Sequence, residues 1–172
     1  MALQRFARDN ATININVCNN ALNDLIAHAL ASAGTPVTKE PQGLLPMIPW
    51  QVGKALSWDV TVACPLAKSY VEAAAWDADA VAEIAATRKL VKYVGLDSRY
   101  IFQPIAVESL GPINDSATTF LGDLGRRIAE QSGEIREGNF LFQQLSVLIQ
   151  RFNAVLLHDS FFDEEAETGI PA

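Results

Sequence analysis

The sequence has few cysteines, no long apolar run and no excess of basic residues. Its two cysteines, Cys18 and Cys64, have no CxxC spacing and are too few for a disulfide framework. No apolar run approaches the roughly 20 residues that cross a bilayer, and the charged stretch 1–10 is not followed by an apolar signal region. We therefore expect an intracellular protein, in the nucleus or cytoplasm, that is neither membrane-bound nor secreted.

Acidic residues outnumber basic ones, but unevenly along the chain. The 13 Lys and Arg residues face 20 Asp and Glu residues, which gives a net charge of −7. Five of the acids lie in 159–172, and the other 158 residues carry 13 basic and 15 acidic groups, a net charge of −2. An acidic end without basic residues is typical of a disordered tail. The rest lacks the basic footprint of a strong nucleic-acid binder, so we expect any DNA affinity to be weak.

The length and the apolar content predict one domain with its own core. The chain has 172 residues, of which 49% are hydrophobic. A domain of this size buries most of the apolar surface of its unfolded chain. We divide the sequence into an N-terminal lead-in at 1–18, a domain at 19–158 and a disordered acidic tail at 159–172.

Hydrophobic periodicity predicts an α/β fold, with α+β as the alternative, in three layers with a small mixed sheet between helices. The alternation of Ile13, Ile15 and Val17 suits either a short strand or an irregular lead-in. A strand at 100–109 follows a helix long enough to return it parallel to an earlier strand. The expected helices are 19–33, 69–94 with a break near Asp77, 114–131 and 140–158, and the expected strands are 47–52, 55–63 and 100–109.

Several common sites are excluded by spacing. Gly53-Lys54-Ala55 lacks the Ser or Thr of a phosphate loop, and no GxSxG elbow occurs. His28 and His158 are far apart, with no Cys or carboxylate at metal-ligand spacing, so we expect ordinary helix residues. The three tryptophans predict packing in the core or the hairpin rather than platforms for base stacking. They are Trp50, Trp58 and Trp76.

One set of residues suits phosphodiester chemistry. Asp59 lies on the polar face of its expected strand, opposite the apolar face that carries Trp58 and Val60. Carboxylates can hold Mg²⁺ while a lysine positions water and offsets the charge of the attacked phosphate, but such a site needs at least two acids. A solvated or structural Asp59 is the alternative interpretation. The other members are Arg88, Lys89 and Lys92 at the end of the following helix and Glu108 on the next strand.

Blocks spread over about 19–155 resemble the C-terminal region of reverse-transcriptase-like proteins of animal non-LTR retrotransposons. The resemblance implies a restriction-endonuclease-like domain of the PD-(D/E)xK type, with Mg²⁺ as its cofactor if it is active. The blocks include Lys39-Glu40-Pro41-Gln42-Gly43-Leu44, Ile48-Pro49-Trp50-Gln51, Trp58-Asp59-Val60-Thr61-Val62, Ala86-Thr87-Arg88-Lys89-Leu90-Val91-Lys92-Tyr93, Phe102-Gln103-Pro104-Ile105 and Gln144-Leu145-Ser146-Val147-Leu148.

The resemblance implies roles for four positions and also shows a departure. Asp59 matches the second acid, Thr61 stands in the usual lysine slot, and the displaced lysine would be Lys92 or, as second choice, Lys89. Relatives carry an Arg-Pro-Asp-Gly segment between the blocks that Leu44-Leu45-Pro46-Met47 joins directly here. The first acid is therefore missing, with Glu40 as its substitute at the metal.

The sequence thus predicts a retrotransposon-derived nuclease fold with impaired cleavage. One alternative is an active Mg²⁺-dependent DNA endonuclease with Asp59 and Glu40 as ligands. Another is a non-catalytic module that binds nucleic acid or protein, with a small basic face at Arg126, Arg127, Arg136 and Arg151. A product without present function is the third. Possible partners are weakly bound DNA, a reverse transcriptase module or further copies of the chain, and no membrane.

Overall fold

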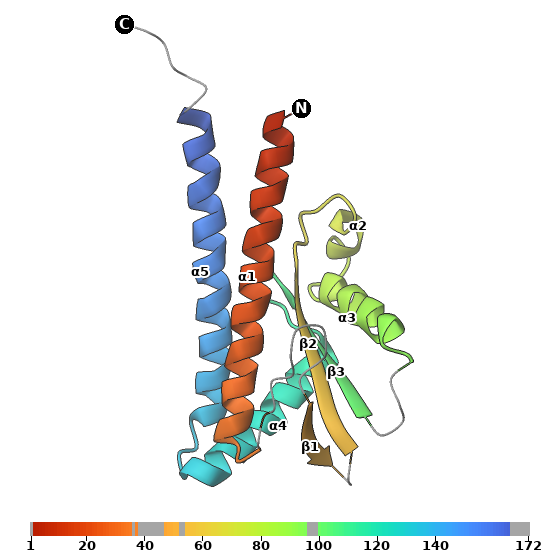
Figure 1. Cartoon of the computed structure of the whole chain (residues 1–172), viewed down its shortest axis with the longest axis vertical. Helices are drawn as coiled ribbons and strands as arrows, with labels where there is room; N and C mark the ends of the chain where they lie inside the picture. Colours follow the sequence, from red (N-terminus) through yellow and green to blue (C-terminus); the bar gives the residue numbers. More distant parts are fainter. Residues whose placement is uncertain (1, 36, 38–46, 52–53, 96–99, 166–172) are drawn as a thin grey trace, which may run out of the picture.

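The computed structural model describes residues 2–35, 37, 47–51, 54–95 and 100–165. Within these residues, five helices and three strands form a mixed α/β arrangement (Figure 1). In chain order they are α1 Ala2–Ser32, β1 Met47–Gln51, β2 Lys54–Ala63, α2 Val71–Ala74, α3 Ala80–Lys92, β3 Tyr100–Glu108, α4 Asp115–Ser132 and α5 Glu137–Glu165.

The sheet is mixed and has β2 in its centre. β1 and β2 pair antiparallel as the expected hairpin, and β3 lies parallel to β2 on the other side. A parallel neighbour requires a crossover connection, which α3 supplies. The register places Asp59 opposite Pro104 and Ala63 opposite Glu108. The hairpin, the parallel pairing and the break after α2 confirm the expectations for this part of the chain.

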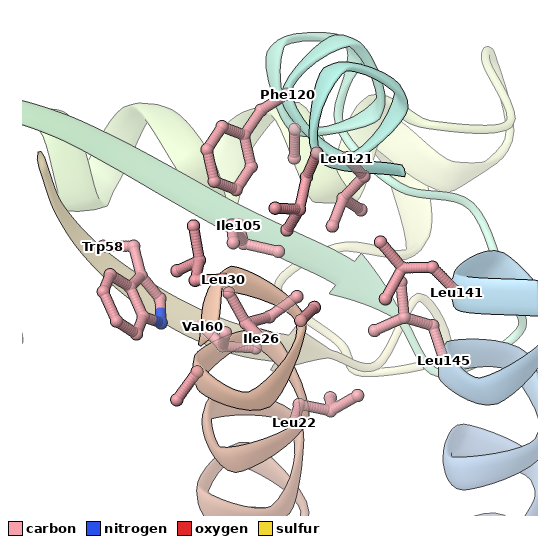
Figure 2. Packing of buried hydrophobic residues seen from close by; sticks show 14 of the residues in the cluster. Leu22, Ile26, Leu30, Trp58, Val60, Ile105, Phe120, Leu121, Leu141 and Leu145 are labelled. Atoms are coloured by element: carbon pink, nitrogen blue, oxygen red, sulfur yellow. The ribbon is translucent and has the colours of Figure 1, made fainter. Parts of the chain in front are cut away.

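The larger core lies between one face of the sheet and helices α1, α4 and α5. Alternate residues of β2 and β3 point to this face, including Trp58, which is 1% exposed, and Ile105. On α1, Leu22, Ile26 and Leu30 recur at helical spacing and meet them (Figure 2). Burying a large apolar side chain stabilises a fold by about 1.5 to 3 kcal/mol, so this cluster is the main source of stability.

The opposite face of the sheet is covered by α3 through small side chains. Ala63 and Ala106 of the sheet meet Val81, Ala82, Ala85 and Ala86 of α3, and all six are buried. Side chains this short let the backbone of α3 lie near the strands. Polar side chains at the C-terminal end of α3 can therefore reach the sheet.

The ends of the chain differ from the expectation. Residues expected as a lead-in form the first half of α1, so Ile13, Ile15 and Val17 are helical rather than extended. The second half of α1 packs in the core, and a helix formed there can propagate into a segment whose own pattern was ambiguous. At the other end α5 continues to Glu165, into the segment assigned to the disordered tail, and 166–172 lie outside the described residues.

The two thiols differ in accessibility, which gives a simple test of the fold. Cys18 is buried against the core and burial raises its pKa to about 11, whereas Cys64 is exposed. A thiol must lose its proton to attack a disulfide reagent. We expect one thiol per chain to react rapidly with Ellman's reagent at pH 8 and the second only after unfolding. Cys64→Ser should remove the rapid phase, and a rapid phase that survives would contradict the burial of Cys18.

Candidate functional site

Asp59 lies in the middle of β2 on the face that α3 covers. Residues alternate along a strand, so its neighbours Trp58 and Val60 enter the main core while Asp59 points the other way. Its side chain is 17% exposed. A carboxylate this close to an apolar layer is stabilised by hydrogen-bond donors, because its charge has lost much of its hydration.

Two residues of α3 and its C-terminal end supply those donors. Lys89 Nζ lies 2.6 Å from Asp59 Oδ2, and the hydroxyl of Tyr93 donates to the same oxygen at 3.2 Å. Lys89 and Tyr93 are four residues apart, which places them on one side of a helix. The Tyr93 ring packs against Phe102 of β3 with centroids 4.5 Å apart, which holds the hydroxyl over the sheet.

The lysine in contact with Asp59 is therefore Lys89, the second choice from the sequence, and not Lys92. Lys92 Nζ lies 4.9 Å from the centre of the Tyr93 ring, on the outer side of that residue. Its hydrogen bond to Tyr93, with a smaller contribution from the charge of Asp59, raises the pKa of Lys92. Of the two lysines, Lys89 thus contacts the carboxylate directly and Lys92 lies beyond the tyrosine.

Glu108 belongs to a different place on the sheet. It is opposite Ala63, four residues along β2 from Asp59, which is about 13 Å at strand spacing. Its Oε1 accepts hydrogen bonds from the backbone N–H groups of Val81 and Ala82, both 3.1 Å long. Glu108 is thus a buried anion at the N-terminus of α3, where the helix dipole favours negative charge. It holds α3 in place and is no part of a site with Asp59.

Arg88 also points away from Asp59. Its guanidinium donates to the hydroxyl of Tyr70 at 2.5 Å and lies 5.0 Å from the centre of that ring. Tyr70 packs beside the alanine-rich contact of α3. Arg88 therefore joins α3 to the segment before α2, and Glu108 joins α3 to β3. Of the five residues grouped from the sequence, the structure brings together Asp59 and Lys89 in direct contact, with Lys92 nearby.

The described residues do not fit a Mg²⁺ site. Glu40, the substitute for the first acid, lies outside the described residues. Among those that are described, no group of three His, Cys, Asp or Glu side chains could hold a metal ion. Asp59 offers one carboxylate, and two donors already meet its Oδ2. A divalent ion usually requires more than one carboxylate, so the arrangement is that of a neutralised acid.

Tyr93 is the residue of this site that sequence reasoning missed. The sequence carried a signal for it, because Tyr93 lies four residues after Lys89 and therefore on the same side of the helix. Asn114 was missed as well: it is buried, its Oδ1 accepts from Ala106 N–H at 2.9 Å, and it precedes α4. Its side chain joins β3 to the residue that precedes α4.

The proposed basic face is weaker than its sequence suggests. Arg126 Nη1 lies 2.7 Å from Glu130 Oε1, and Nη2 lies 3.6 Å from Asp123 Oδ1. These two carboxylates raise the pKa of Arg126 and offset its charge toward a phosphate.

Trp76, which was expected to pack in the core or the hairpin, is 86% exposed in the connection between α2 and α3, so that expectation is wrong. Trp58 is the one that lies in the core, and the side chain of Trp50 lies outside the described residues.

Comparison with known proteins leaves the site to be judged on its geometry. No protein-family model matches the sequence, and no curated protein matches it.

Proposed function

We propose that this chain is a retrotransposon-derived domain with a PD-(D/E)xK nuclease-like core whose cleavage is impaired. The observation that carries the proposal is the contact between Asp59 of β2 and Lys89 of α3, with 2.6 Å between Oδ2 and Nζ. The sequence resemblance implies an acid on a strand and a lysine moved into the next helix. We expect a protein of this origin to be located in the nucleus or the cytoplasm.

The order of elements supports the proposal. A hairpin of β1 and β2 is followed by the crossover helix α3 and by the parallel strand β3, with α1 on the other face of the sheet. The acid lies on the central strand and faces the crossover helix, which carries the lysine. A strand that bears the acid and a helix that bears the cation are thus held together by Glu108 and by the alanine contact.

Impairment follows from what surrounds the acid. When bound, a Mg²⁺ ion would supply a Lewis acid for the phosphate and lower the pKa of the attacking water. In this chain Lys89 and Tyr93 satisfy Asp59 Oδ2, and the segment that carries the first acid in relatives is absent. An ion that bound here would lie beside the amino group of Lys89 and would still need a second ligand. The ion pair is then structural, and it ties α3 to β2.

A plasmid-nicking assay tests the proposal. We expect no conversion of supercoiled DNA above that of the Asp59→Ala variant, in Mg²⁺ or in the more permissive Mn²⁺, because one neutralised acid does not hold the metal. Robust nicking by the unchanged chain that disappears in Asp59→Ala would contradict the impairment and favour the alternative of an active endonuclease, with Glu40 as the second ligand. Lys89→Met should then also abolish nicking, whereas Lys92→Met should not.

A chain with the missing segment restored tests the nuclease-like core separately from the impairment of cleavage. Inserting Arg-Pro-Asp-Gly after Leu45 returns the segment that relatives carry, and we expect metal-dependent nicking to appear if the core is nuclease-like. Asp59→Asn in the repaired chain should remove it again, since that change deletes a ligand charge without changing side-chain shape. A folded, repaired chain without nicking would contradict the nuclease-like core.

A further inference from the structure

The apolar helix α5 is largely uncovered by the rest of the chain. Its stretch Glu137–His158 has a mean hydropathy of 1.3, enough by length and composition to cross a membrane, yet only 17% of that stretch is buried. Leu141, Leu145 and Ile149 are buried in the core, and Phe142, Leu148 and Phe152 pack against it while staying partly exposed. α1 and α5 lie side by side and extend together past the sheet (Figure 1). An exposed apolar helix face of this kind marks an interaction surface.

The exposed face has a regular composition. Five residues, spaced three and four apart, form a line that we call the α5 stripe: the half-buried Glu137 and the exposed Phe140, Gln144, Val147 and Arg151. Phe140 is 53% exposed and Val147 is 66% exposed. A three-four spacing keeps such residues on one side of a helix, as in the contact seam of paired helices.

The stripe borders a groove that α1 completes. Leu25 of α1 forms one wall, and Phe140, Val147, Leu148 and Arg151 of α5 form the other, around a hollow of about 440 Å³. A smaller and more enclosed hollow of about 250 Å³ continues it between Leu25, His28 and Glu137. A bulky side chain that projects from a second helix can therefore seat between α1 and α5.

The charges along the stripe indicate which helix could supply that side chain. Glu137 and Arg151 each lie seven residues from Gln144, on opposite sides of it. Within the described part of the chain, neither side chain takes part in a hydrogen bond or ion pair. A second α5 laid antiparallel with its Gln144 opposite this one brings each Glu137 to the Arg151 of its partner, while a parallel arrangement brings like charges together. The stripe is self-complementary in the antiparallel direction only.

We propose that the chain forms a two-fold dimer in which the α5 stripes of two copies pack antiparallel about Gln144. Each Phe140 then faces Val147 and Leu148 of the other copy and enters the groove beside α1. The two Gln144 side chains meet at the axis, where amides can hydrogen-bond to each other. Such isologous contacts are the commonest route to soluble homo-oligomers.

The polar residues of the exposed face favour this occupant over a lipid bilayer. Gln143, Gln144, Gln150 and Arg151 are all exposed on α5. Amide and guanidinium groups without partners are costly in hydrocarbon, whereas a protein partner and the water at its rim can satisfy them. The exposed face of α5 is therefore apolar enough to bind a protein partner, but its polar side chains make it unsuited to a lipid bilayer.

Sedimentation equilibrium of the full chain tests the proposal. We expect twice the chain mass of 18.7 kDa at micromolar concentrations. Val147→Glu should weaken the dimer at least tenfold, because it places a charge in the seam. The matched control is Val91→Glu, which changes an equally exposed valine on α3 and should leave the dimer unchanged. Circular dichroism of each variant checks that the fold is retained.

A charge exchange tests the direction of the pairing. Arg151→Glu should weaken the dimer, and the double variant Glu137→Arg with Arg151→Glu should restore it, since opposite charges again meet between copies. In a Cys64→Ser background, Gln144→Cys should form a covalent dimer on oxidation, and Gln150→Cys on another side of α5 should not. A monomer at every concentration, a dimer insensitive to Val147→Glu, a double variant that stays weak, or a monomer that instead floats with lipid vesicles would each overturn the proposal.

Discussion

The Gly125→Ala variant is expected to unfold about 2 kcal/mol more easily than the unchanged chain. Gly125 lies in α4 at the place where that helix meets the start of α5, and a Cβ added there would stand 2.5 Å from the Cα atom of Gly138. Carbon atoms normally approach to about 3.5 to 4.0 Å, and the obstacle is backbone that cannot rotate away. The helices must separate, and overpacking of this kind costs about 1 to 3 kcal/mol even though alanine favours the helix.

Two matched alanine variants provide the controls. Gly122 lies in the same helix three residues earlier with nothing within 4 Å of an added Cβ, so Gly122→Ala should raise the free energy of unfolding by about 0.5 to 1 kcal/mol. Gly138→Ala should be tolerated, because its Cβ would lie at ordinary contact distance, 3.8 Å, from Gly125. Urea unfolding followed by circular dichroism measures all three. Equal effects of Gly125→Ala and Gly122→Ala would contradict the close approach of α4 and α5.

Removing the Glu108 carboxylate is expected to lower the free energy of unfolding by about 2 to 4 kcal/mol. Glu108 is 3% exposed and accepts two N–H groups from the first turn of α3. Glu108→Ala leaves these buried donors without an acceptor, which costs about 1 to 3 kcal/mol for each, and removes the negative charge from the helix N-terminus. Because α3 carries Lys89, its displacement also releases Asp59.

The comparison with Glu108→Gln separates hydrogen bonding from charge. Glutamine keeps an acceptor oxygen at the same position, so we expect it to recover all but about 1 kcal/mol. Glu83→Ala is the matched control on the surface: its Oε1 also accepts a backbone N–H, that of Asp115 at 2.5 Å, but in an exposed place. Thermal unfolding should rank Glu108→Ala far below both others. A Glu108→Ala variant as stable as Glu83→Ala would contradict a structural role for Glu108.

The sequence predicted the sheet well because each strand had a local signal. Alternation along 55–63 gave both the strand and the face that carries Asp59, and the length of the following helical segment implied the parallel pairing of β3. The ends of α1 and α5 had no such signal. Each end continues a helix whose other part packs in the core, and a helix that has formed can propagate without an apolar pattern of its own.

The candidate site was predicted in its residue types but not in its geometry. Lys89 and Lys92 are three residues apart on one helix, and the choice between them depends on the rotation of α3 against the sheet. Two contacts set that rotation, the alanine layer and the capping of α3 by Glu108. Glu108 itself was grouped with Asp59 because both are acids on neighbouring strands. Only the register shows that they lie at different levels of the sheet.

The parallel pairing of β2 and β3 also governs how the chain can fold. Ala55 pairs with Tyr100, so the strand pair closes only after the whole intervening segment is brought together. The β1–β2 hairpin and the α4–α5 hairpin close short loops and can form within microseconds. Docking of α1 onto α5 joins two elements from opposite ends of the sequence. Loop-closure entropy thus makes the sheet and the α1–α5 pair the slow steps, with the core-facing side of α5 exposed until α1 docks.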